Sequence, residues 1–177
     1  MEEQAATLLT ALRKSSSPID AKVALLNNLK SDIKHLRVPE AAQPTIFECV
    51  RLAIGSLTSS SLASAGFSTL GHLLKRLNLQ DQTAVIASHS GRLFPILMER
   101  LGDARESLRV AASQTLTDLW PVDHVEVERL MRDVALTGTH PRAKEMAMLW
   151  VAKVVATCMK VLFEFFAANL CIDEQGA

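Results

Sequence analysis

Histidine and cysteine are the residue types of this chain best suited to bind a metal ion or to act as a nucleophile. The five histidines and three cysteines are His35, His72, His89, His124, His140, Cys49, Cys158 and Cys171. None of them pairs with another at the short spacing of a zinc site, and three widely spaced cysteines do not suggest a disulfide framework. We therefore expect no metal, no cofactor and a reducing compartment.

One tripeptide, Ser88-His89-Ser90, places a serine nucleophile beside a histidine base. It lies in a segment with helical periodicity and has no acidic residue placed to orient the histidine, whereas triad residues usually sit at loop ends held by a sheet. The GxxxxGK, GxGxxG, GxSxG and HExxH motifs are also absent from the sequence. We expect a polar helix face and no enzyme. The alternative is a small all-helical hydrolase or transferase, which a turnover abolished by one His or Ser substitution would support.

Composition and charge limit the class of protein. Hydrophobic residues make up 49% of the 177 and charged residues 21%, with only 7 Gly and 6 Pro, which favours one domain of packed helices. Nineteen basic residues balance nineteen acidic ones, so no net field favours nucleic acid.

The N-terminus lacks the pattern of a signal peptide. Lys153, Lys160 and Glu164 interrupt the apolar stretch from Val151 to Ile172, so we expect no membrane insertion.

Apolar residues recur at helical spacing along most of the chain, in paired segments joined by short polar breaks. One such stripe runs from Ile46 to Leu57. Successive second helices recur at roughly forty residues, the period of HEAT and armadillo arrays. We predict an all-α fold, an α-solenoid of about four HEAT-type hairpins over residues 1–154, followed by a divergent C-terminal helix and tail over residues 155–177.

The breaks inside the hairpins of a stacked array form a row along one edge, and such rows bind partners. Arg105, Arg142 and Lys144 share this predicted edge. When the last two units are overlaid, Arg109 coincides with Lys144. Arg109 and Lys144 could instead bridge to an acid in the adjacent repeat, so both uses stay open.

Two segments resemble the TOG domains of the CLASP family. They are the run from Leu93 to Ala112, which contains Gly102-Asp103 and Arg105, and the segment from His140 to Glu145 followed by Trp150. The opening of the chain and its serine-rich break at 58–61 are similar to the N-terminal domain of fungal members. The resemblance implies a microtubule-associated protein that binds αβ-tubulin through its intra-hairpin loops, catalyses no reaction, stabilises microtubules and supports spindle formation. It also implies a place in the cytoplasm and cytoskeleton, and in the nucleus and spindle during mitosis.

The resemblance implies which residues of this chain form the tubulin-binding loops. These are Ser16, Ser17, Pro18, Ser59, Ser60, Asp103, Arg105, Arg142 and Lys144. Because tubulin is strongly acidic, the three basic residues would supply charge-assisted hydrogen bonds. We expect a monomer. The alternative is a HEAT-repeat scaffold for another protein or peptide, which mutations acting only on a helix face would favour.

Two departures from the family pattern lead to further expectations. The first loop carries serines and Pro18 where many tubulin-binding TOG domains have an aromatic residue. The array is also truncated, with four hairpins in place of six. We expect a last helix, from about Ala156 to Cys171, to cover the open end of the solenoid as a cap. Its apolar residues would be Val161, Leu162, Phe165, Phe166 and Leu170.

Overall fold

The computed structural model describes the backbone of residues 1–170 and the side chains of residues 1–160. This part of the chain is helical and contains no strand. Its helices are α1 (Glu2–Arg13), α2 (Ile19–His35), the short 3-10 helix η1 (Glu40–Ala42), α3 (Gln43–Ile54), α4 (Ser60–Leu79), α5 (Thr83–Leu101), α6 (Glu106–Leu119), α7 (His124–Thr137) and α8 (Pro141–Leu170). The predicted all-α fold is confirmed.

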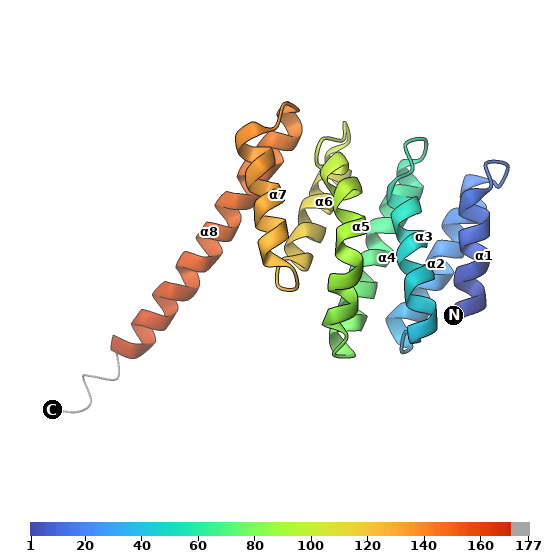
Figure 1. The fold of residues 1–177 in the computed structure, drawn as a ribbon, viewed down its shortest axis with the longest axis horizontal. Helices are drawn as coiled ribbons and strands as arrows, with labels where there is room; N and C mark the ends of the chain where they lie inside the picture. The colour runs from blue at the N-terminus through green and yellow to red at the C-terminus, as the bar shows by residue number, and fades with distance from the viewer. Residues whose placement is uncertain (171–177) are drawn as a thin grey trace.

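The helices form four hairpins stacked side by side in two layers (Figure 1). Helices α1, α3, α5 and α7 make the first layer. Helices α2, α4, α6 and the start of α8 make the second, in which each contacts the next. The loops inside the hairpins lie along one edge of the array and the turns between hairpins along the other (Figure 1). A repeat with this topology buries its apolar faces only by stacking on its neighbours.

The core is continuous from Ala5 in the first hairpin to Trp150 in the last. Leu8, Leu26, Leu70 and Leu97 come from four different helices, and each is fully shielded from solvent. Each helix contributes one apolar stripe, because residues three and four apart lie on the same helix face. The two layers therefore share one core that holds the loops in fixed relative positions.

Helix α8 is one continuous helix that extends away from the stacked hairpins (Figure 1). The expectation of a separate cap helix from about Ala156 is wrong, because α8 has no break there and Val155 and Met159 are exposed. The stretch after Trp150 contains no glycine or proline that would end a helix before Leu170. The side chains of the proposed cap, from Val161 onward, and Cys171 lie outside the described residues. No helix within residues 1–170 combines the length and apolar character needed to cross a membrane.

Candidate functional site

The candidate site is the row of four intra-hairpin loops, residues 14–18, 55–59, 102–105 and 138–140, with the first turn of each helix that follows. We call this the loop edge (Figure 1). Ser16, Ser17 and Pro18 lie in the first loop; Ser59 ends the second loop as the N-cap of α4, and Ser60 is the first residue of α4. Asp103 and Arg105 lie in the third loop, and Arg142 and Lys144 in the first turn of α8. All nine residues predicted for tubulin binding are therefore on one edge.

A buried lysine holds the first loop. Lys22 in the first turns of α2 is only 9% exposed and donates a 2.9 Å hydrogen bond from Nζ to the carbonyl oxygen of Lys14. The backbone N–H of Ser17 also donates to this carbonyl, at 3.4 Å. Ser16 and Pro18 remain exposed beside it. Lys22 was not predicted as part of the site, because a lysine four residues after a proline carries no signal of burial.

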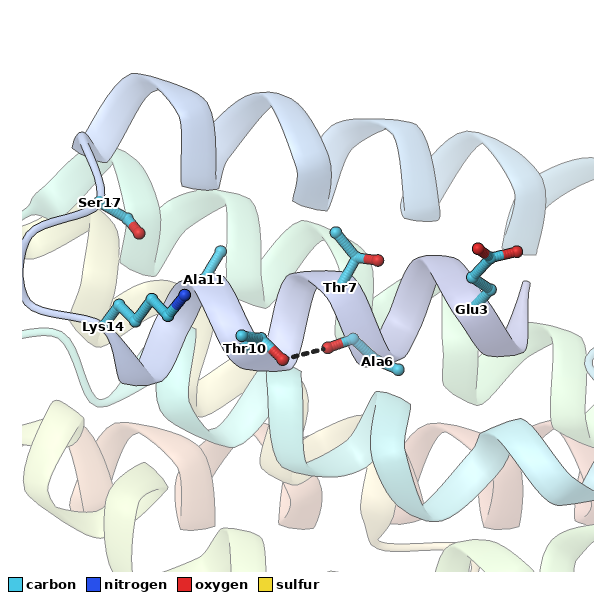
Figure 2. A pocket seen from close by; sticks show the side chains of 7 residues that line it. All are labelled: Glu3, Ala6, Thr7, Thr10, Ala11, Lys14 and Ser17. Atoms are coloured by element: carbon cyan, nitrogen blue, oxygen red, sulfur yellow. Dashed lines mark hydrogen bonds between the residues drawn. The ribbon is translucent and has the colours of Figure 1, made fainter.

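A shallow hollow of about 460 Å³ runs along the outer face of α1 and reaches the first loop at Lys14 and Ser17 (Figure 2). Its walls are mostly alanine and threonine. The hydroxyl of Thr10 donates to the Ala6 carbonyl at 3.0 Å, within the same helix. Glu3 lies at one end of the hollow and Lys14 and Ser17 at the other, so its charged groups do not converge on a small ligand. We therefore interpret the hollow as part of the exposed end of the array and not as a binding site.

The second loop presents an exposed leucine and a buried serine. Ser59 is only 6% exposed, and its Oγ accepts a 3.2 Å hydrogen bond from the Leu62 backbone N–H, which caps α4. The Ser59 side chain therefore shapes the loop, and the place of Ser59 in a tubulin-binding loop stays a prediction. Leu57, predicted as part of an apolar helix stripe, is instead 69% exposed, because α3 ends at Ile54. That prediction is wrong, and Leu57 is an exposed apolar side chain on the loop edge.

A buried ion pair fixes the third loop and joins it to the second. Nη1 of Arg100 lies 2.7 Å from Oδ2 of Asp103, and the two side chains are 3% and 6% exposed. The same guanidinium donates to the carbonyl oxygens of Ile54, at 2.9 Å, and Ser56, at 3.1 Å. Arg100 therefore spans two neighbouring repeats through hydrogen bonds to the main chain.

Asp103 also positions Arg105. Its Oδ1 accepts from the Arg105 backbone N–H at 2.9 Å and from Arg105 Nε at 3.1 Å. Burial opposes ionisation of this carboxyl. The Arg105 backbone N–H and the guanidinium groups of Arg100 and Arg105 outweigh burial and lower the pKa of Asp103. Asp103 thus acts within the loop, and the 42% exposed Arg105 side chain remains available at the surface.

Arg109 reinforces the same loop from the first turn of α6. Its Nη1 donates to the carbonyl oxygens of Asp103, at 3.0 Å, and Ala104, at 3.1 Å. The alternative in which Arg109 bridges to an acid in the adjacent repeat is therefore wrong, because its guanidinium bonds carbonyl oxygens of its own loop instead. Lys144, its counterpart in the overlay, is half-buried and pairs with no residue within 1–160.

The third and fourth loops touch through Gly102 and His140. A Cβ at Gly102 would lie 3.1 Å from two atoms of the His140 ring, so the ring occupies the space that a side chain would need. His140 Nδ1 also accepts a 3.4 Å hydrogen bond from the Ala143 backbone N–H at the start of α8. Arg142 stands beside this contact and is exposed. The loop edge is thus linked from the second loop to the fourth.

The serine and histidine that suggested a nucleophile lie in different environments. Ser90 is 1% exposed and its Oγ lies 2.9 Å from Oδ2 of Asp123, so the expectation of a polar surface face is wrong for Ser90. His89 instead stacks on Phe47, with ring centroids 4.4 Å apart. The histidine therefore bonds neither the serine nor the carboxylate. Within residues 1–160, no group of three or more His, Cys, Asp or Glu side chains is arranged to hold a metal ion.

Comparisons with known proteins identify relatives of this chain. The family model "CLASP N terminal" matches residues 1–161. The chain is 52% identical over 177 residues to Protein STU1 of Phaeosphaeria nodorum, covering all of this chain and 14% of that protein. It is 51% identical over 154 residues to Protein stu1 of Aspergillus fumigatus, covering 87% of this chain and 11% of that protein. A third relative, Protein stu-1 of Neurospora crassa, is 39% identical over 150 residues, covering 85% of this chain and 13% of that protein.

The matches cover most or all of this chain but only a small part of each relative. No solved structure matches the chain significantly. The chain spans about a seventh of the length of the Phaeosphaeria protein, since it covers 14% of it. The family model covers α1 to α7 and the part of α8 up to residue 161. The chain therefore belongs to the family of CLASP N-terminal domains.

Proposed function

We propose that this domain binds αβ-tubulin through its loop edge, and that it serves as a microtubule-binding domain. The observation that carries the proposal is the linked row of loops, in which Leu57, Arg105 and Arg142 are exposed on one edge. Family membership supports the choice of partner. The proposed action is binding alone, without a catalysed reaction, cofactor, nucleic acid or inserted membrane segment.

The recognition we propose combines charge with a small apolar contact. Arg105 and Arg142 would donate charge-assisted hydrogen bonds to carboxylates of an acidic tubulin surface, with Lys144 behind them. Exposed ion pairs of this type contribute about 0.2–1 kcal/mol each, so two or three of them give modest affinity that weakens with salt. Leu57 would add a buried apolar contact at the second loop. Pre-organisation of the loops by Arg100 and His140 lowers the cost of ordering them on binding.

The wider role follows from the same proposal. We infer that the longer protein stabilises dynamic microtubules and supports mitotic spindle formation, and that it acts in the cytoplasm and cytoskeleton, and in the nucleus and spindle during mitosis. We propose that the domain acts as a monomer. Similarity to the STU1 proteins over most of this chain supports the microtubule-associated role alone.

Co-sedimentation with microtubules and gel filtration with αβ-tubulin, each at low and moderate salt, test the proposal. We expect Arg105→Glu/Arg142→Glu to abolish salt-sensitive binding. The matched control is Arg37→Glu/Arg132→Glu, which makes the same charge change at two exposed arginines outside the loop edge and should bind like the wild type. Equal loss in both double variants, or loss only from helix-face substitutions, would contradict the loop-edge mechanism. No binding by a folded wild type would contradict tubulin as the partner of this domain.

A further inference from the structure

Four basic side chains gather on the second helix layer, away from the loop edge. We call them the basic cluster: Lys30 and Lys34 on α2, and His72 and Lys75 on α4. These two helices lie next to each other in the array and contact each other (Figure 1). In a chain with equal numbers of acidic and basic residues, the cluster is a local excess of positive charge.

Arg76 sets the register of the two helices that carry the cluster. Its Nε donates to the Ile33 carbonyl oxygen at 3.0 Å, and its Nη2 donates to the Lys34 carbonyl oxygen. The C-terminal end of α4 is therefore held against the C-terminal end of α2. Lys30 and His72 lie about one turn before Lys34 and Lys75 along the two helices. The charges of Lys34, Lys30 and Lys75 all act on the His72 ring, which places the four side chains near one another.

Stabilisation of helix ends does not account for most of the cluster. Basic residues interact favourably with a helix dipole only in the last turn, where α2 has Lys34 and His35 and α4 has Arg76. Lys30, His72 and Lys75 all lie before the last turn of their helices. Burial and then the charges of Lys34, Lys30 and Lys75 lower the pKa of His72. No member of the cluster forms an ion pair with a residue within 1–160. The three lysines of the cluster thus keep like charges together without a described partner, and the lowered pKa of His72 favours its neutral form.

A groove of about 370 Å³ between α4 and α6 opens beside the cluster, and both His72 and Lys75 line it. Ser64, Ser68 and Gln114 supply hydroxyl and amide groups along its length. A Cβ added at Gly71 would meet nothing within 4 Å, so the middle of the groove is open. Asp118 also lines the groove, where it accepts a 2.9 Å hydrogen bond from the Gln114 side chain.

We propose that the groove between α4 and α6 binds an extended, carboxylate-rich peptide segment whose acidic side chains pair with the basic cluster. Serine and glutamine side chains along a groove can bond the N–H and C=O groups of an extended backbone, while lysines beside it select for carboxylates. Single-stranded nucleic acid suits this groove less well than an acidic peptide does. Phe67, the aromatic residue among those lining the groove, is only 6% exposed and so offers no face for base stacking.

Fluorescence anisotropy with a labelled oligoglutamate peptide tests the proposal, with an oligoglutamine peptide of equal length as the neutral probe. We expect oligoglutamate to bind and oligoglutamine not to, with affinity falling as salt rises. Lys34→Gln/Lys75→Gln should weaken binding about tenfold, since each substitution removes one charge pair and leaves the main-chain bonds of Arg76 intact. Lys153→Gln removes one charge at an exposed lysine of α8; it is the control for a single lysine change away from the groove and should leave binding unchanged.

A second readout locates the peptide on the molecule. On titration with oligoglutamate, the NMR signals of the His72 ring should shift, while those of His140 at the loop edge should stay in place. Oligoglutamine binding equally well, unchanged affinity in Lys34→Gln/Lys75→Gln, or shifts confined to His140 would overturn the proposal. Tighter binding of an oligonucleotide of matched charge would overturn the choice of peptide. Because the assay contains no tubulin, its failure would leave the loop-edge proposal standing.

Discussion

Arg100 forms a 2.7 Å ion pair with Asp103, and both side chains are almost completely buried. Breaking such a pair by removing one partner leaves an uncompensated buried charge and costs about 3–5 kcal/mol. Arg100 also bonds two carbonyl oxygens of the preceding repeat, which would lose their partners as well. The pair is therefore the contact at the loop edge whose loss we expect to cost most.

We expect Arg100→Leu to lower the free energy of unfolding by about 3–5 kcal/mol in urea denaturation. Arg105→Leu is the control: its side chain is 42% exposed, so it should lower the free energy by less than about 1 kcal/mol. Similar losses in the two variants would show that the buried pair adds little to stability.

The lowered pKa of Asp103 predicts how its contribution depends on pH. The pKa of Asp103 is lower in the folded state than in the unfolded chain, where an aspartate has a pKa of about 3.9. The carboxyl therefore stabilises the fold at pH values above about 3.9, and this stabilisation is lost as the pH falls through the folded-state pKa. Asp103→Asn should therefore be less stable than the wild type at neutral pH. The difference in unfolding free energy should shrink below about pH 4. A difference that stays constant down to acid pH would contradict the role given to this carboxyl.

Leu57 and Leu70 should behave in opposite ways, although both are leucines in the second hairpin. Leu57 is 69% exposed, so Leu57→Ser should change the unfolding free energy by less than about 0.5 kcal/mol while weakening microtubule co-sedimentation. Leu70 is 0% exposed, and Leu70→Ala should cost about 2–5 kcal/mol. Undiminished co-sedimentation of a folded Leu57→Ser variant would remove this leucine from the proposed contact.

The two cysteines with described side chains should differ in reactivity. Burial, and to a lesser extent the charge of Glu48, raises the pKa of Cys49 to about 12, and its Sγ lies 3.4 Å from the Ala5 carbonyl oxygen. Cys158 is exposed. Because the thiolate is the reactive form, iodoacetamide at mildly alkaline pH should label Cys158 well before Cys49 in the native protein. Peptide mass spectrometry measures the order, and equal labelling of both sites would contradict it; in denaturant they should react alike.

The sequence predicted the hairpins and the loop edge because both depend on local periodicity and on short polar breaks. It could not predict the partners of Arg100, since Ile54 lies 46 residues away and carbonyl oxygens carry no sequence signal. Leu57 was misassigned because its spacing continues the stripe of α3, although the helix ends at Ile54. The continuity of α8 could have been predicted, since no glycine or proline interrupts the segment after Trp150.

The hydrogen bonds by which Arg100 joins the second and third loops affect how the sequence of this surface can vary. Arg100 binds the main-chain oxygens of residues 54 and 56, which every amino acid possesses. The side chain at position 56, and those at the neighbouring loop positions, can therefore be exchanged without removing these bonds. Mutation can thus diversify what the loop tips recognise while the spacing between them stays constant.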